Sequence, residues 1–197
     1  MTDRHRLRSP LLAALLLGAL LGPAPVAAKP QLALEDSRIA DLDGLTSTAA
    51  RCGSLSVPED PDDAGGPHIE LAVAVVPAVA THARPDPLVL IAGGPGQGSI
   101  QGFAPLLGAF AGVQRERDLV LVDQRGTGGS NRLDCDMPDD ALESGDIPPA
   151  ELAALASECL AGLPGRPQFY TTSIAVRDLD AVRAARQTRP ATIAFRR

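Results

Sequence analysis

The sequence predicts an α/β fold in which a mostly parallel sheet carries helices on both faces. Two short, continuous apolar runs, residues 87–92 and 118–123, are typical of strands that are buried on both sides. Between them, residues 99–114 place apolar side chains three and four positions apart, which indicates a helix. A strand, a helix and a second strand in this order form the repeating unit of a parallel sheet.

Further elements extend this pattern on both sides. Residues 68–79 are rich in β-branched side chains with partial alternation and predict another strand. Residues 172–186 have apolar positions at helical spacing, with Thr172 or Ser173 available as the N-cap. A shorter helical pattern covers 149–160, and residues 191–195 predict a last strand.

Length and composition limit the classes of protein that this chain can belong to. The length of 197 residues is typical of a single domain with a short targeting segment before it. The formal net charge is −6, and the aromatic residues are four Phe, one Tyr and no Trp. Nucleic-acid binding needs a basic surface and aromatic stacking groups, so we exclude that class of partner.

The first 28 residues have the pattern of a signal peptide. Three arginines among the first ten residues precede a twelve-residue apolar run at 11–22, which is too short to span a bilayer as a stable anchor. Small side chains at Val26 and Ala28 predict cleavage after Ala28. We therefore expect export to the periplasm or the medium, with an N-terminal extension at 29–50 and a partial catalytic domain at 51–197.

Export also changes how the three cysteines are interpreted, because an oxidising compartment permits disulfides. Cys135 and Cys159 flank an acidic, proline-containing excursion, so a local bridge between them is the favoured pairing. Cys52 is then left over. The sequence has no Cys-x-x-Cys motif and no cluster of His and Cys, so we expect no metal site.

Two glycine-rich turns, each directly after a predicted buried strand, carry the functional information. The first runs from Ala92 to Ser99 and has the sequence AGGPGQGS, and the second runs from Asp123 to Ser130 and has the sequence DQRGTGGS. Glycines allow sharp turns whose backbone amides point outward, as a site needs if it is to hold a developing negative oxygen. In the second turn, Asp123 and Arg125 are placed to brace the structure rather than to bind substrate.

Together the two turns resemble those of the α/β-hydrolase fold, specifically its proline iminopeptidase and tripeptidyl aminopeptidase-like serine peptidases. Matching features are the segment 52–58, the stretch 170–172 and the helix around 178–183, so that the resemblance covers about residues 51–183. Many relatives carry His where this chain has Ala92, a departure that weakens assignment to the classical proline iminopeptidases and leaves the tripeptidyl aminopeptidase-like branch open.

The resemblance implies a serine hydrolase that acts on a small peptide or ester without a cofactor. It assigns the oxyanion-hole loop to Gly93, Gly94, Pro95 and Gly96. The structural turn in this family matches a second set of four residues here: Asp123, Gln124, Arg125 and Gly126.

The catalytic groups of that fold are not found in this sequence. The fold needs a nucleophile in a G-x-S-x-G elbow, followed by an acid and a His, and no such elbow occurs. The only histidines after the targeting segment, His68 and His82, precede the glycine-rich loop. We therefore expect the N-terminal part of a hydrolase domain, truncated before the elbow, inactive alone, and able to pair with a complementary C-terminal fragment.

Two alternatives come from other classes of protein. Residues 96–102 have the pattern G-x-G-x-x-x-G, and Asp123 ends the next strand where a ribose-binding acid would lie, so a nucleotide-binding domain is a minor alternative. The other alternative is an exported, non-catalytic remnant that binds a partner.

Overall fold

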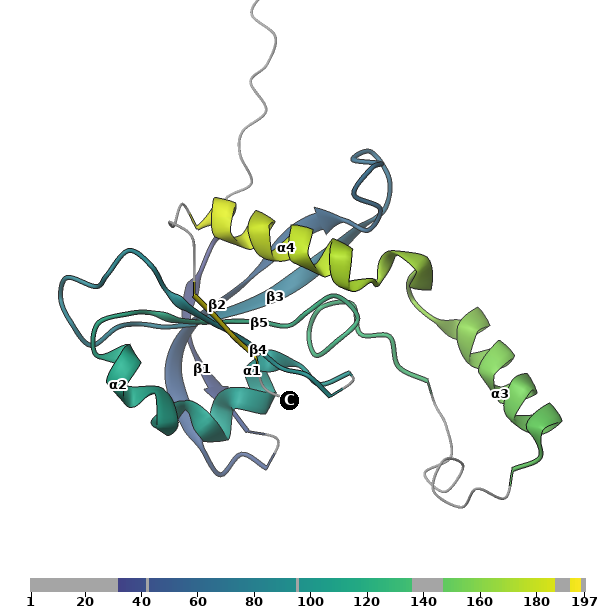
Figure 1. Ribbon diagram of the computed structural model, residues 1–197, viewed down its shortest axis with the longest axis horizontal. Helices are drawn as coiled ribbons and strands as arrows, with labels where there is room; N and C mark the ends of the chain where they lie inside the picture. The colour runs from purple at the N-terminus through teal and green to yellow at the C-terminus, as the bar shows by residue number, and fades with distance from the viewer. Residues whose placement is uncertain (1–31, 42, 95, 136–146, 187–191, 196–197) are drawn as a thin grey trace, which may run out of the picture.

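The computed structural model describes residues 32–41, 43–94, 96–135, 147–186 and 192–195. The predicted signal peptide lies outside these residues. Six strands form one sheet in the order β1-β2-β3-β5-β4-β6 (Figure 1). Their bounds are β1 Glu35–Ala40, β2 Ser47–Pro58, β3 His68–Val76, β4 Leu88–Ile91, β5 Leu119–Val122 and β6 Thr192–Phe195.

The expectation of a mostly parallel sheet is wrong. Strands β1, β2, β3 and β5 pair antiparallel in succession, and only the pairings of β4 with β5 and of β4 with β6 are parallel. The connections from β1 to β2 and from β2 to β3 are too short for a crossover helix, so these neighbours must run antiparallel. The α/β class itself holds, with one mixed sheet. Strand β1 comes from the predicted N-terminal extension, where no periodicity indicated a strand.

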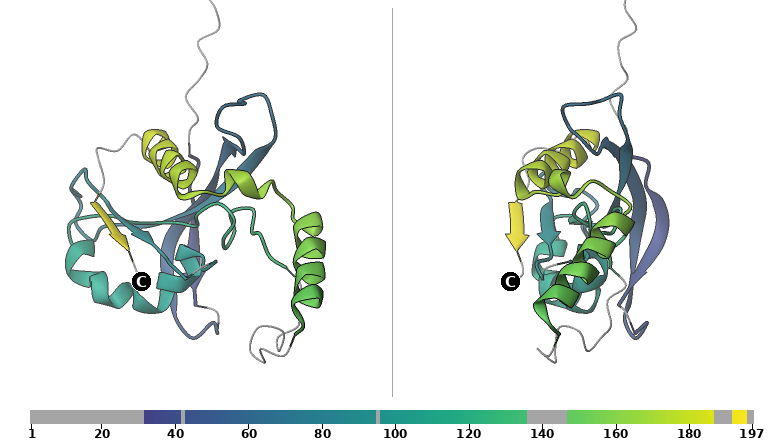
Figure 2. Two further views of the ribbon diagram at one scale, coloured as in Figure 1. Left: turned by 45° about the vertical axis from the view of Figure 1, so that its right-hand side comes forward. Right: turned by 90° about the vertical axis from the view of Figure 1, so that its right-hand side faces the viewer.

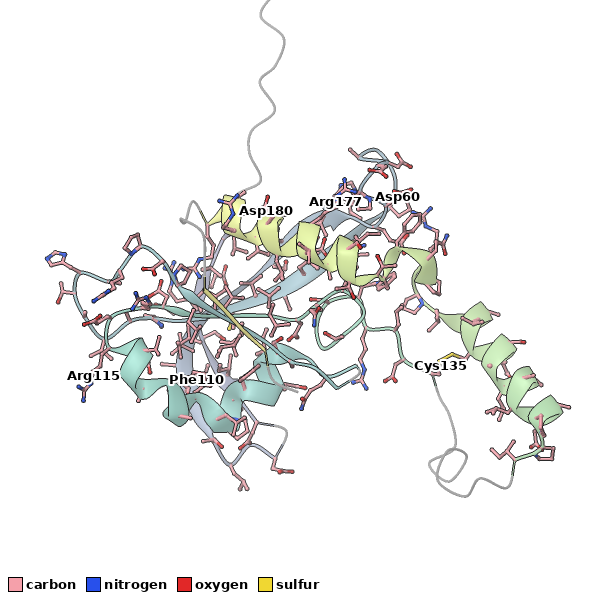
Figure 3. All side chains as sticks on the ribbon, viewed as in Figure 1. Asp60, Phe110, Arg115, Cys135, Arg177 and Asp180 are labelled. Carbon is pink, nitrogen blue, oxygen red and sulfur yellow. A yellow bond between two sulfur atoms is a disulfide. The ribbon has the colours of Figure 1, made fainter. Side chains whose placement is uncertain are left out.

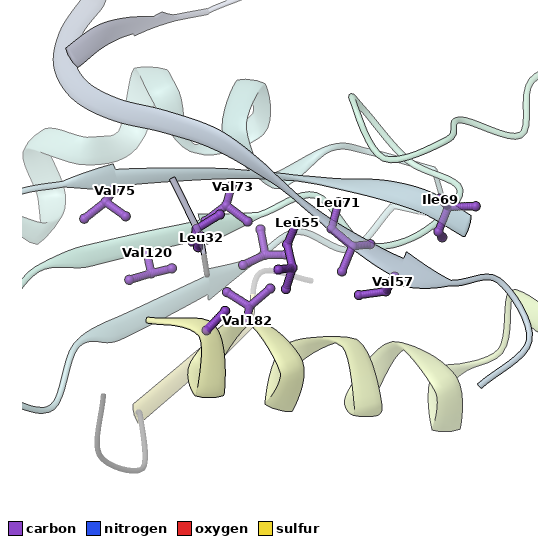
Figure 4. Packing of buried hydrophobic residues seen from close by; sticks show 11 residues of the cluster. Leu32, Leu55, Val57, Ile69, Leu71, Val73, Val75, Val120 and Val182 are labelled. Atoms are coloured by element: carbon purple, nitrogen blue, oxygen red, sulfur yellow. The ribbon is translucent and has the colours of Figure 1, made fainter. Parts of the chain in front are cut away.

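Helices cover both faces of the sheet, as the sequence predicts. Helix α4, Thr172–Ala185, packs on one face, where Val182 and Ala185 join a core formed mainly by β2, β3 and β5 (Figure 4). The opposite face is covered by the segment between β4 and β5, through Phe103 and Leu107. Every residue of β5 is buried, and its side chains alternate between the two cores, which explains its continuous apolar run.

The predicted helix over 99–114 is broken into three parts. It consists of α1 (Ser99–Phe103), a 3₁₀ segment η2 (Ala104–Phe110) and α2 (Ala111–Gln114). Pro105 lacks an amide hydrogen, so it cannot donate the backbone hydrogen bond that would continue the α-helix through this point. The apolar spacing still places Phe103 and Leu107 in the core.

Helix α3, Pro149–Gly162, lies to the side of the sheet rather than over either face, and none of its residues is buried (Figures 1 and 2). A disulfide between Cys135 and Cys159 attaches it to the segment that follows the second glycine-rich turn (Figure 3). The Cα atoms of this pair are 5.3 Å apart. Cys52 is a free, half-buried thiol on β2.

Candidate functional site

The two glycine-rich turns meet where neighbouring parallel strands send their connections to opposite faces of the sheet. The chain leaves β4 toward the face of α1 and η2, whereas the connection from β5 to β6 carries α4 on the other face (Figure 1). In α/β sheets the crevice at such a switch point, beyond the carboxyl ends of the strands, is the usual place for a ligand. The predicted site residues of both turns that the structure describes therefore lie at one location.

The Asp123 carboxylate joins the two turns. It is 3% exposed, and it accepts hydrogen bonds from the Ile100 amide at 2.9 Å and the Gly129 amide at 2.8 Å. The backbones also approach closely, since a Cβ added at Gly98 would lie 2.9 Å from the Gly128 Cα. Asp123 is thus a structural group, and its carboxylate is not available to a ribose hydroxyl. This occupancy disfavours the nucleotide-binding alternative.

Two buried serine hydroxyls complete this framework. Ser130 donates to the Asp123 carbonyl at 2.7 Å and accepts from the Ala72 amide at 2.8 Å. Ser99 accepts from the Ala92 amide at 3.0 Å. Both side chains are almost fully buried, so each fixes backbone rather than presenting a nucleophile to solvent.

The first glycine-rich turn begins at Ala92, and Gln124 of the second turn contacts its first peptide. The Gln124 side-chain amide donates to the Ala92 carbonyl at 3.2 Å. Gly93 is half-buried and Gly94 is exposed, and within the described part of the chain neither amide donates a hydrogen bond. Gly96 has φ +83°, which favours glycine, and Pro95 lies outside the described residues. These free amides have the chemistry expected of a site that binds a negative oxygen.

Arg125 is a buried brace. Its side chain is 1% exposed and forms a two-pronged ion pair with Asp178 of α4, with N–O distances of 2.6 and 2.7 Å. It also donates to the carbonyls of Glu59 at 2.7 Å and Phe169 at 3.0 Å. The guanidinium therefore connects the second turn to α4 and to two loops, and it cannot reach a substrate.

A second ion pair, which no sequence pattern indicated, lies beside this brace. The Glu59 carboxylate is buried and accepts from the Arg166 amide and from its guanidinium, both at 2.6 Å. Tyr170 lies next to it, and its hydroxyl accepts from the Asn131 amide group. Glu59 belongs to a Pro- and Asp-rich stretch that has the composition of an ordinary turn, so no local signal marked it as buried.

This pair makes part of the stability pH-dependent. Burial would raise the pKa of Glu59, but the hydrogen bonds and charge of Arg166 outweigh burial and hold it below the ordinary value. A lowered folded-state pKa gives stability that is present above the unfolded pKa of about 4.3 and is lost as pH falls through the folded pKa. We expect Glu59→Gln to cost about 2 kcal/mol at pH 7 and progressively less below about pH 4. Urea unfolding of both proteins between pH 3.5 and 7 tests this, and a constant difference would contradict it.

A mostly apolar cavity of about 290 Å³ lies beside the site, between α4 and the sheet. Val89 and Val120 contribute to its floor and Leu179 to its wall, and Gln124 lines it as well. His68 and His82 are both exposed and lie in neither glycine-rich turn. The described residues contain no cluster of His, Cys, Asp and Glu suited to a metal ion, and no helix among them could cross a membrane.

The fold and the site therefore define an α/β protein with a glycine-rich loop at a switch point of its mixed sheet. Sequence comparison indicates which type of reaction proteins similar to this chain are named for. The chain is 34% identical to Carboxylesterase B of Mycobacterium tuberculosis and to a protein of Mycobacterium bovis described as a hydrolase, over an alignment 217 positions long in each case. The alignment covers 90% of this chain but 41% of each relative, so the chain spans about two-fifths of their length. No protein family model matches the chain.

Proposed function

We propose that this chain forms the oxyanion-loop part of an exported serine hydrolase that cleaves carboxylic esters or peptides. The observation that carries the proposal is the pair of unengaged amides, Gly93 and Gly94, at the switch point of the sheet. The similarity to proteins named as a hydrolase and a carboxylesterase supports a hydrolytic reaction. Export rests on the signal-peptide pattern of residues 1–28.

The loop would act in the transition state. A serine that attacks the carbonyl carbon of a substrate turns the carbonyl oxygen into an oxyanion, and backbone amides placed about 3 Å away stabilise that charge. The same attack needs a base, because a serine hydroxyl is a weak nucleophile at neutral pH. Since Ser99 and Ser130 are buried and both histidines lie outside the two turns, we propose that a polypeptide outside this chain supplies the nucleophile, acid and base.

The topology indicates where that polypeptide would attach. Strand β6 pairs with β4 alone among the described strands, so its other edge can accept a further strand. Adding a parallel strand there continues the direction from β5 to β6, and the right-handed crossover rule then places the intervening helix on the face of α4. The 290 Å³ apolar cavity opens on that face, beside Leu179.

The name of the relatives favours esters as the first substrates to test, and the turn motifs favour aminopeptidase substrates as the second. Reading the coding DNA past the codon of residue 197 would show whether a G-x-S-x-G elbow, an acid and a His follow in any frame. The chain is then expressed alone and joined to that polypeptide. Both forms are assayed with 4-nitrophenyl butyrate and with aminoacyl 4-nitroanilides.

We expect the chain alone to hydrolyse these substrates no faster than buffer without protein does. The joined protein should hydrolyse the ester and react with a fluorophosphonate. Labelling of the isolated chain at one specific serine would overturn the proposal that it is inactive alone. A joined protein that melts cooperatively but cleaves neither substrate would overturn the hydrolase proposal. If no elbow follows in any frame, a non-catalytic, partner-binding role becomes the better explanation.

A further inference from the structure

The orientation of the peptide between Ala92 and Gly93 decides whether the loop can bind an anion. A trans peptide is planar, so its carbonyl and its N–H point in opposite directions. Glycine at position 93 removes the Cβ that would otherwise restrict this plane, so either orientation is sterically accessible. In one orientation the loop offers the Gly93 N–H, and in the other it offers a carbonyl oxygen that repels negative charge. Something outside the glycine must therefore select the orientation.

We propose that Gln124 is the positioning residue that makes this selection, an inference that rests on the proposed function. Its Nε2 donates to the Ala92 carbonyl at 3.2 Å, which turns the Gly93 N–H away from Gln124 and leaves it without an acceptor among the described residues. The other side of Ala92 is held as well, because its amide donates to the buried Ser99 hydroxyl at 3.0 Å. The remaining freedom is therefore the orientation of the peptide plane between Ala92 and Gly93.

Gln124 itself is held firmly enough to set that plane. Its carbonyl accepts from the Thr127 amide at 2.9 Å and from the Thr127 hydroxyl at 2.8 Å. Its neighbours in sequence are Asp123, which joins the two turns, and Arg125, which is paired with Asp178. The backbone of Gln124 is thus fixed in position. Its side chain connects the second turn to the peptide between Ala92 and Gly93.

The Gln124 side chain selects the orientation because it donates a hydrogen bond to the Ala92 carbonyl. A side chain that can only accept would favour the opposite orientation, because the Gly93 N–H could then donate to it and the Ala92 carbonyl would turn outward. Gln124→Glu is such an acceptor. Gln124→Lys keeps a donor, and Gln124→Met keeps the approximate size with neither function. Gln101→Glu is the matched control, since Gln101 is exposed on α1 and the charge change is the same.

The first readout is structural and needs no catalysis. Crystal structures of the 197-residue chain and its variants, with the nuclear Overhauser effect between the Ala92 Hα and the Gly93 amide, report the peptide plane. We expect the wild-type, Lys and control proteins to share one orientation and the Glu variant to show the other. If the Glu variant does not fold, the Met variant is used, in which both orientations should be present. An unchanged peptide plane in the variant that folds would overturn the proposal.

The second readout is kcat of the joined hydrolase with 4-nitrophenyl butyrate. Loss of one oxyanion donor lowers kcat by about 100-fold to 1000-fold, so we expect that loss for Gln124→Glu with KM little changed. Gln124→Lys should stay within about tenfold of the wild type. Equal losses in the Lys and Glu variants would overturn the selection of orientation by a donor. If the peptide flips in the Glu variant but the wild-type protein has no hydrolase activity, the proposed function fails and the positioning role stands.

Discussion

Replacing Arg125 by methionine is expected to lower the free energy of unfolding by about 3–5 kcal/mol, because it leaves the Asp178 carboxylate buried without its partner. The two side chains are 1% and 8% exposed, so water cannot take over the lost hydrogen bonds. The carbonyls of Glu59 and Phe169 lose their donor in the same variant. Urea unfolding followed by circular dichroism measures the effect at pH 7.

Arg177 provides the matched control, since it is an arginine on α4, adjacent to Asp178, that also forms an ion pair. Its ion pair with Asp62 is solvent-exposed, with the arginine side chain 55% exposed. We expect Arg177→Met to cost less than about 1 kcal/mol. The double variant Arg125→Met, Asp178→Leu should recover much of the loss, because an apolar pair replaces the buried ions. A single Arg125→Met variant as stable as the Arg177→Met control would show that the brace contributes little.

The central strands could be predicted because local sequence determines them. Strands β4 and β5 are continuous apolar runs, and their two-sided burial follows from the cores on both faces of the sheet. Both glycine-rich turns could also be assigned, since each follows its strand directly and glycine is needed for the backbone there. Helix α4 begins where Thr171 accepts from the Ile174 amide, one residue before the predicted cap at Thr172 or Ser173.

The direction of the first strands could not be predicted in the same way. Whether a strand such as β3 pairs parallel or antiparallel depends on its partner in space, and residues 77–118 separate β3 from its partner β5 in the sequence. The buried pair of Glu59 and Arg166 has the same origin. These residues are 107 positions apart, and neither lies in a periodic segment that would indicate burial.

The contact between Gln124 and Ala92 is a third feature that could not be predicted from the sequence. The turn motif placed Gln124 among four structural residues but gave no reason to connect it with Ala92, which is 32 positions earlier. The connection exists because β4 and β5 are parallel neighbours, so the residues just after each strand meet at one edge. Contacts of this type follow from the topology, once the pairing of strands is known.

Gly128→Ala is expected to destabilise the same region by about 3 kcal/mol, from two causes that act together. Gly128 has φ +49°, a conformation that costs a residue with a Cβ about 1–2 kcal/mol. The added methyl group would also overlap the Asp123 carboxylate and press toward the Gly98 Cα, and overpacking of this kind costs about 1–3 kcal/mol. Thermal and urea unfolding measure the total.

A double-variant cycle separates the two causes. Asp123→Ala removes the overlapping carboxylate, so Gly128→Ala in that background should cost less, about 1–2 kcal/mol for the backbone conformation plus the remaining contact with the Gly98 Cα. Gly112→Ala is the control, because Gly112 lies in α2 with no positive φ and open space around it. That change should leave stability equal or slightly higher. If Gly128→Ala unfolds at the same urea concentration as Gly112→Ala, the close approach of the two turns does not hold in solution. The Asp123 carboxylate would then have room to move, and the fixed position of Gln124 next to it would lose its main support.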